Sequence, residues 1–269
     1  MPRSLNLGRL WLPVVVAFLF VGAPAVVEFY TDWLWYGETG YRAVFLRSLG
    51  VKTGVGAAVF VIAFAFLAVN ARGALRGLRA YQLTIPTEDG PRTIAAAARS
   101  VRLLAYGVST LAALALAAYA AARWEMWLLF WYATPFGKPD PILGRDASFY
   151  LFRLPLLQLL QGLTKATVLL AMAVVAAGHF LAGGLGLGAQ GPFASRGAIR
   201  QLSALAAVLL VSLAFEAYLE IPATLIEPSG IVHGAPNADV EARLPALRLL
   251  VVAAAAGVCL LYTSDAADE

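Results

Sequence analysis

The chain has 269 residues, of which 61% are hydrophobic and 13% are charged, and its formal net charge is +4. Soluble domains carry about 25% charged residues, so this composition excludes an ordinary soluble domain. Its single cysteine, Cys259, excludes an intrachain disulfide. The excess of basic residues does not indicate a nucleic-acid partner, because basic and aromatic residues do not interleave on a polar surface segment.

Apolar segments about as long as a bilayer is thick recur along the chain. They are rich in Ala, Leu and Val and do not alternate with polar residues, which favours helices over the strands of a barrel. The sequence therefore predicts an all-α fold, a polytopic transmembrane helix bundle in a bilayer. We predict five complete spans, at residues 10–27, 51–69, 103–122, 156–185 and 202–219, and a truncated sixth that begins near Leu244.

The first span has a competing interpretation as a signal peptide. It follows a basic start, and Ala23-Pro24-Ala25 has the small residues of a cleavage site. We favour a retained span, because the apolar run continues beyond that site and further spans follow.

The segments between the spans differ in character. Residues 28–50 are polar and aromatic and predict a loop at the headgroup interface. Residues 70–102 form a basic loop, which Pro86 and Pro91 are expected to divide into two short helical arms. The glycine-rich residues 183–201 predict a loop without a phosphate-binding motif, and residues 221–243 predict a polar loop.

The segment from Arg123 to Arg153 begins with WEMWLLFWY, which is too short to cross a bilayer and predicts a short interfacial helix or a shallow re-entrant segment. The prolines and glycines from Pro135 to Gly144 then exclude a continuous helix. Asp146 is placed to cap the start of the next helix.

Orientation follows from the basic residues. With the N-terminus in the cytoplasm, each side of the membrane holds ten lysines and arginines. Arg3 and Arg9 break this tie because they lie close to the first span, whereas the next basic residue, Arg42, is well beyond it. We therefore predict a multi-pass protein of the bacterial cell membrane with a cytoplasmic N-terminus.

The last residues, Cys259–Glu269 (CLLYTSDAADE), resemble the translation of a sequencing adapter. They change abruptly from a hydrophobic span to an acidic tail. We expect residues 1–258 to be the N-terminal part of a larger protein and residues 259–269 not to be native; a genuine acidic tail is the alternative.

Three segments resemble the uncharacterised protein family 0182, a bacterial group of large multi-pass membrane proteins. They are DWLWYGETGYRAVF (32–45), FGKPDPILGRDASFYLFRLP (136–155) and VHGAPNADVEARLPALRLL (232–250). The resemblance implies an N-terminal transmembrane bundle followed by a large extracytoplasmic region. It implies no activity and no catalytic residue.

Three ionisable residues lie within predicted spans, where burial is costly unless the charge is paired or hydrated. Glu216 and Glu220 share one helix face, and Lys165 is expected at a similar depth on the neighbouring span. They are a candidate intramembrane polar site. A structural ion pair, or side chains that reach the interface, is the alternative.

Other candidates have simpler explanations. Asp140 and Asp146 are weak candidates for a hard-cation site, but turn formation and helix capping explain both carboxylates without a metal. His179 is interpreted as a hydrogen-bonding partner between helices, because no second histidine or thiol is near it in sequence. We expect no cofactor.

Two functions remain open. The first is a membrane anchor or scaffold for an extracytoplasmic region, which assembles with copies of itself or with other membrane proteins. The second is a transporter or channel whose polar path includes Lys165, Glu216 and Glu220. An enzyme acting on lipid is a third possibility, although no catalytic triad, carboxylate pair or zinc motif is found.

Overall fold

The computed structural model describes residues 11–78, 80–87, 90–188, 191–226, 228–229 and 232–267. Its described residues are mainly helical, which confirms the all-α prediction, and the strands form three small two-stranded hairpins. The chain divides into two compact units, Met1–Gly54 and Val55–Glu269.

The first unit holds helix α1 (Trp11–Glu38) and the start of α2 (Arg42–Ala74). The turn between the two helices contains Gly40, whose positive φ of 79° favours glycine. The buried ring of Phe45 contacts Phe29, Trp33 and Tyr36 across this turn. The prediction of a loop at residues 28–50 is therefore wrong, because these aromatic residues pack on each other between two helices.

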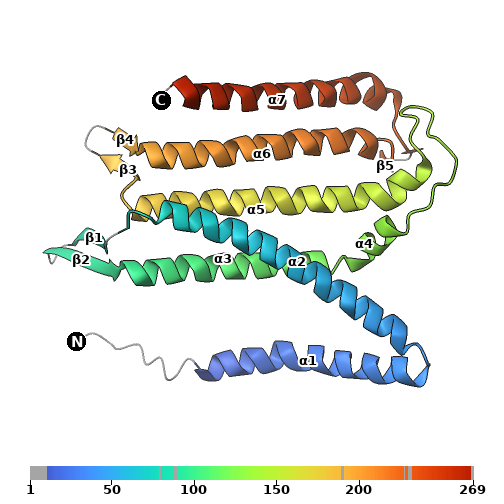
Figure 1. Ribbon diagram of the computed structural model, residues 1–269, viewed down its shortest axis with the longest axis horizontal. Helices are drawn as coiled ribbons and strands as arrows, with labels where there is room; N and C mark the ends of the chain where they lie inside the picture. Colours follow the sequence, from blue (N-terminus) through green and yellow to red (C-terminus); the bar gives the residue numbers. More distant parts are fainter. Residues whose placement is uncertain are drawn as a thin grey trace. The chain divides into compact units, whose positions relative to one another are not determined.

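The helices of the second unit are the rest of α2, α3 (Ala98–Ala121), α4 (Trp124–Trp131), α5 (Leu154–Leu181), α6 (Arg196–Ala223) and α7 (Leu244–Ala267). Single π-helical turns, η2 (Phe149–Arg153) and η3 (Asp239–Arg243), lead into α5 and α7. Helix α6 lies between α5 and α7, and α5 also contacts α3 (Figure 1).

Five helical segments among the described residues are long and apolar enough to cross a membrane. They are α2, α3, η2 with α5, α6, and residues 239–259 of η3 and α7. Helix α1 contains residues 11–27 of the first predicted span. The structure describes the backbone of residues 11–19 but not their side chains. The eight-residue α4 occupies the segment predicted as a short interfacial helix.

Strands β1 (Ala80–Thr87) and β2 (Gly90–Ala97) pair antiparallel in the segment where two helical arms were predicted. That prediction is wrong because Pro86 and Pro91 disfavour a helix interior, whereas a two-stranded ribbon tolerates proline at its free edges. The prolines lie opposite each other in the register.

Residues 183–201 also contain more structure than predicted. Strands β3 (Leu185–Gly188) and β4 (Gly191–Ala194) form a hairpin. Helix α6 then starts at Arg196, where the Ser195 hydroxyl accepts a hydrogen bond from the Ala198 amide. The last hairpin, β5 (Pro228–Ser229) with β6 (Val232–His233), lies within the predicted polar loop.

The second unit has a hairpin end and a loop end (Figure 1). The hairpin end carries β1–β2 and β3–β4, and the loop end carries α4, residues 132–148 and the α6–α7 connection. Between them, an apolar cluster of Leu67, Ala171, Val175 and Leu205 joins α2, α5 and α6. Polar contacts between the helices are found on both sides of this apolar cluster.

Candidate polar site between the helices

The first polar group lies between α5 and α6, toward the loop end. Lys165 forms an ion pair with Glu216, and the Gln161 amide donates to the second oxygen of Glu216 at 3.1 Å. The same amide donates to the carbonyl of Ser212 at 3.3 Å. We call Gln161, Lys165 and Glu216 the carboxylate cluster. The side chains of Lys165 and Glu216 are 31% and 34% exposed, so the pair is only partly removed from its surroundings.

Glu220 has a different partner from Glu216, although the two share one helix face. It accepts a hydrogen bond at 3.0 Å from Arg243, in the turn before α7. A cavity of about 250 Å³ lies beside both pairs, and its lining includes Gln158, Lys165, Glu216 and Glu220. All three predicted site residues therefore meet at one cavity, each with a partner of opposite charge.

A second polar group lies at the hairpin end, where α2, α5 and α6 meet. His179 contacts the Gln201 carbonyl oxygen through Nε2 at 3.0 Å. Because an amide oxygen can only accept, His179 is the donor. The Gln201 nitrogen donates to the backbone oxygen of Asn70 at 2.9 Å and to its side-chain oxygen at 3.3 Å. We call Asn70, His179 and Gln201 the amide cluster. The interpretation of His179 as a hydrogen-bonding partner between helices is confirmed.

The helices approach closely beside the amide cluster. A Cβ atom at Gly178 would lie 2.9 Å from the Cβ of Ala74 and would clash with it. A Cβ at Gly73 would lie 3.0 Å from the Gln201 amide. Small residues therefore bring α2, α5 and α6 close enough for the side-chain amides to bridge them.

The loop of residues 136–148 folds around its two carboxylates. Asp140 accepts hydrogen bonds from the amides of Ile142 and Leu143 and from the Tyr150 hydroxyl. Asp146 accepts from the amides of Phe136, Gly137 and Ser148, the last at the start of the helical segment as predicted for a cap.

These contacts change the acidity of both groups. Burial raises the pKa of Asp140, but the hydrogen bonds from Ile142, Tyr150 and Leu143 outweigh it and leave the pKa below its ordinary value. Hydrogen bonds from Ser148 and Phe136 lower the pKa of Asp146 further. Both aspartates are therefore stabilised as anions by the loop itself, and the described residues contain no cluster of three or more metal-ligating groups.

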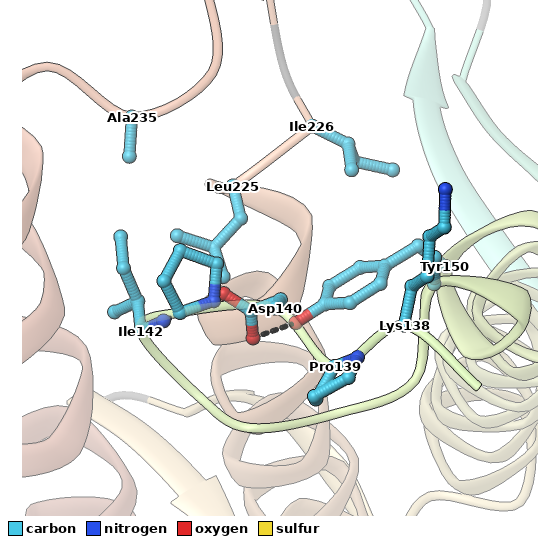
Figure 2. Close-up of a pocket in the computed structure, with 10 residues that line it drawn as sticks. Lys138, Pro139, Asp140, Ile142, Tyr150, Leu225, Ile226 and Ala235 are labelled. Carbon is cyan, nitrogen blue, oxygen red and sulfur yellow. Dashed lines mark hydrogen bonds between the residues drawn. The ribbon is translucent and has the colours of Figure 1, made fainter.

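A cavity of about 370 Å³ separates this loop from the α6–α7 connection. Figure 2 shows the Asp140–Tyr150 hydrogen bond on one side and Leu225, Ile226 and Ala235 on the other. Arg145 ties the same loop to α6, since it donates to the Tyr218 hydroxyl at 2.8 Å and lies over the Phe149 ring. The loop is thus an ordered cap on the helix ends.

Sequence reasoning missed the partners of the candidate residues. Gln161 lies one helical turn before Lys165, and its polarity inside an apolar span was a signal that could have identified it. Arg243, Gln201 and Asn70 lie at predicted span ends, where a polar residue is ordinary. No local pattern distinguishes them.

The model of the uncharacterised protein family UPF0182 matches residues 9–267. This chain belongs to that family. A UPF0182 protein of Geobacter sulfurreducens is 35% identical over 247 residues, which cover 89% of this chain and 28% of the relative. A UPF0182 protein of Geobacter sp. strain M21 is 34% identical over 92% of this chain and 28% of its own length. One from Salinispora tropica is 33% identical over 99% of this chain and 27% of its own length.

This UPF0182 chain therefore spans little more than a quarter of the length of these relatives. No solved structure matches it. The family relationship agrees with the resemblance seen in the sequence, and it assigns no activity.

Proposed function

We propose that this chain is the membrane anchor of a longer protein of the bacterial cell envelope. In this proposal its apolar helices lie in the cell membrane with the N-terminus in the cytoplasm. The loop end, with the ordered 136–148 loop, then faces the extracytoplasmic side and supports the region that the longer relatives have in addition. The support is the set of five helices long and apolar enough to cross, together with the length of the relatives.

The observation that carries this proposal is the pairing of Lys165 with Glu216 and of Glu220 with Arg243. Charges used for transport must face a path that ions or substrate can enter. Here each charge is paired with an opposite charge on a neighbouring helix or in the turn before it. A polar path would also have to continue toward the hairpin end, where the apolar cluster of Leu67, Ala171, Val175 and Leu205 lies between the two polar groups.

A transporter or channel is the second candidate, and the cavity beside Lys165, Glu216 and Glu220 favours it. A volume of about 250 Å³ is large enough for several water molecules. Helix motions that open the apolar cluster would connect this cavity to the hairpin end.

Flux measurements separate the two functions. Wild-type protein and Glu216→Gln are reconstituted into vesicles, and proton and cation leak are followed with entrapped dyes, while thermal unfolding is measured on the same preparations. If the protein is an anchor, we expect the proton and cation leak of wild-type vesicles to equal that of empty vesicles. Glu216→Gln should then unfold at a lower temperature and leave the leak unchanged. Wild-type leak above that level, lost in a variant of unchanged stability, would overturn the anchor.

Orientation is tested with single cysteines in a Cys259→Ser background. Lys138→Cys in the loop is expected to react with an impermeant maleimide added to intact cells, and Arg76→Cys near the hairpin end only after the cells are opened. The reverse pattern would place the N-terminus outside.

A further inference from the structure

A groove on the flank of the helices carries a further inference. It adjoins the cavity beside the carboxylate cluster and shares Gln158 and Gly162 with the lining of that cavity. It lies between α3 and α5 and has a volume of about 490 Å³, within the range of about 300–1,000 Å³ typical of ligand sites. Its lining includes Ala112, Ala115 and Tyr119 of α3 and Gln158, Gly162 and Ala166 of α5. We propose that this groove binds one acyl chain of an anionic phospholipid, whose phosphate is held by Arg123 and Gln158 at the loop end.

The groove has the length of one leaflet. From Gln158 to Leu170, both of which line it, α5 rises about 18 Å at about 1.5 Å per residue. Half of a hydrocarbon core of about 30 Å is about 15 Å. A groove that runs along the helices from their loop end to mid-span therefore matches a lipid tail.

The polar residues lie only at one end of the groove. Arg123 follows the C-terminus of α3, and its guanidinium carbon lies 3.6 Å from the centre of the Tyr119 ring. One of its nitrogens donates to the Tyr119 carbonyl at 3.2 Å. The stack holds a positive charge beside the groove mouth, and the remaining guanidinium donors suit a phosphate. The exposed Gln158 lines the same groove as Tyr119.

Gly162 opens the middle of the groove. A Cβ atom added there would meet no atom within 4 Å, so the space beside this glycine is empty of protein. The residues opposite, Ala112 and Ala115, are also small. Together they leave a channel in the α3–α5 contact that a flexible chain can fill, which gains dispersion contacts along its length.

This inference rests on the proposed placement in a membrane, and its test has an outcome separate from the flux assay. The 269-residue protein is purified in a mild detergent and titrated with phosphatidylglycerol or phosphatidylcholine of matched chains, and bound lipid is counted by native mass spectrometry. We expect one phosphatidylglycerol to bind more tightly than phosphatidylcholine. Arg123→Gln should weaken the binding of phosphatidylglycerol about tenfold, so that the protein no longer prefers it to phosphatidylcholine.

Gly162→Leu is expected to weaken the binding of both lipids about tenfold, because the new side chain occupies the groove. Gly107→Leu is the matched control: Gly107 is exposed on α3, also meets no atom within 4 Å, and does not line the groove. Arg153→Gln, at an exposed basic residue of the loop end, is the control for charge. Equal binding by Gly162→Leu and Gly107→Leu would overturn the proposal.

A phospholipid with a photoactivatable acyl chain supplies a measurement on the wild-type protein that needs no variant. Labelling is expected on the α3 and α5 peptides that contain Ala115 and Gly162. Uniform labelling of all apolar helices would mean annular lipid only and would overturn the site. Efficient disulfide formation between a cysteine at position 115 and a cysteine on α1 would also overturn the site, because protein would then cover the groove.

Discussion

The carboxylate cluster and the amide cluster both connect α5 to α6, but by different chemistry, and the amide cluster also includes Asn70 of α2. In the carboxylate cluster, Lys165 and Glu216 carry formal charges, lie beside a cavity and remain about one-third exposed, whereas Gln161 is neutral and buried. Asn70, His179 and Gln201 form a chain of hydrogen bonds where glycines bring the helices into contact, and His179 is buried. Close packing thus accompanies the amides, whereas looser packing accompanies the charges, which suggests that the amide cluster fixes the helix positions and the ion pair is more adjustable.

The largest expected effect is on the packing beside the amide cluster. Gly178→Leu forces a side chain toward Ala74, which lies within clash distance of a Cβ. Overpacking of this kind costs about 3 kcal/mol or more when the backbone must move. Thermal unfolding in detergent measures the loss. Gly162→Ala, on the same helix but facing open space, should be as stable as the wild type or more so; equal effects of the two changes would remove the contrast in packing.

The next effect is on the ion pair. Glu216→Gln leaves the Lys165 ammonium without its counterion, and we expect a loss of about 1–3 kcal/mol, below the roughly 3–5 kcal/mol of a fully buried pair. The double variant Lys165→Met, Glu216→Leu should recover most of this loss, because apolar residues of similar volume replace buried pairs well. A double variant less stable than either single variant would mean that the charges themselves hold α5 against α6.

A smaller loss is expected in the amide cluster. Gln201→Leu removes the neutral hydrogen bonds to His179 and Asn70, each of which contributes about 0.5–1.5 kcal/mol, and the new apolar contact offsets part of this loss. Chemical unfolding of the purified protein is the measurement. Gln158→Leu, at an exposed glutamine of α5, should change stability by less than about 0.5 kcal/mol.

The smallest effect extends the comparison to carboxylates outside the helices. The pKa of Asp146 in the folded loop lies below its ordinary value of 3.8. The loop is therefore fully stabilised above that value and loses this stabilisation as the pH falls through the lower, folded value. Carboxyl carbon NMR should show Asp146 titrating below pH 3.8 together with the amide shifts of Phe136 and Ser148. In Asp146→Asn the amide shifts of Phe136 and Ser148 should no longer change over this pH range. If they still changed in the same way, the titration would belong to another group.

Long apolar runs could be predicted as helices from the sequence, because backbone groups in such runs must pair within their own segment. Asp146 as a cap and α4 as a short helix followed from equally local rules. The segment of residues 28–50 could not be predicted in this way. Its aromatic residues suit an interface loop and a helix turn equally well, and the contacts of Phe45 with three other rings decide between them.

The family, the class of fold and the presence of Lys165, Glu216 and Glu220 inside long apolar segments follow from the amino-acid sequence. The partners of these residues follow from the packing of the helices: Glu216 contacts Lys165 and Gln161 on α5, whereas Glu220 contacts Arg243 before α7. The physical reason is range. Helix formation depends on neighbours within a turn or two, but a charge buried between helices is stabilised by whichever group the packing brings within about 3 Å, and that group lies far away along the chain.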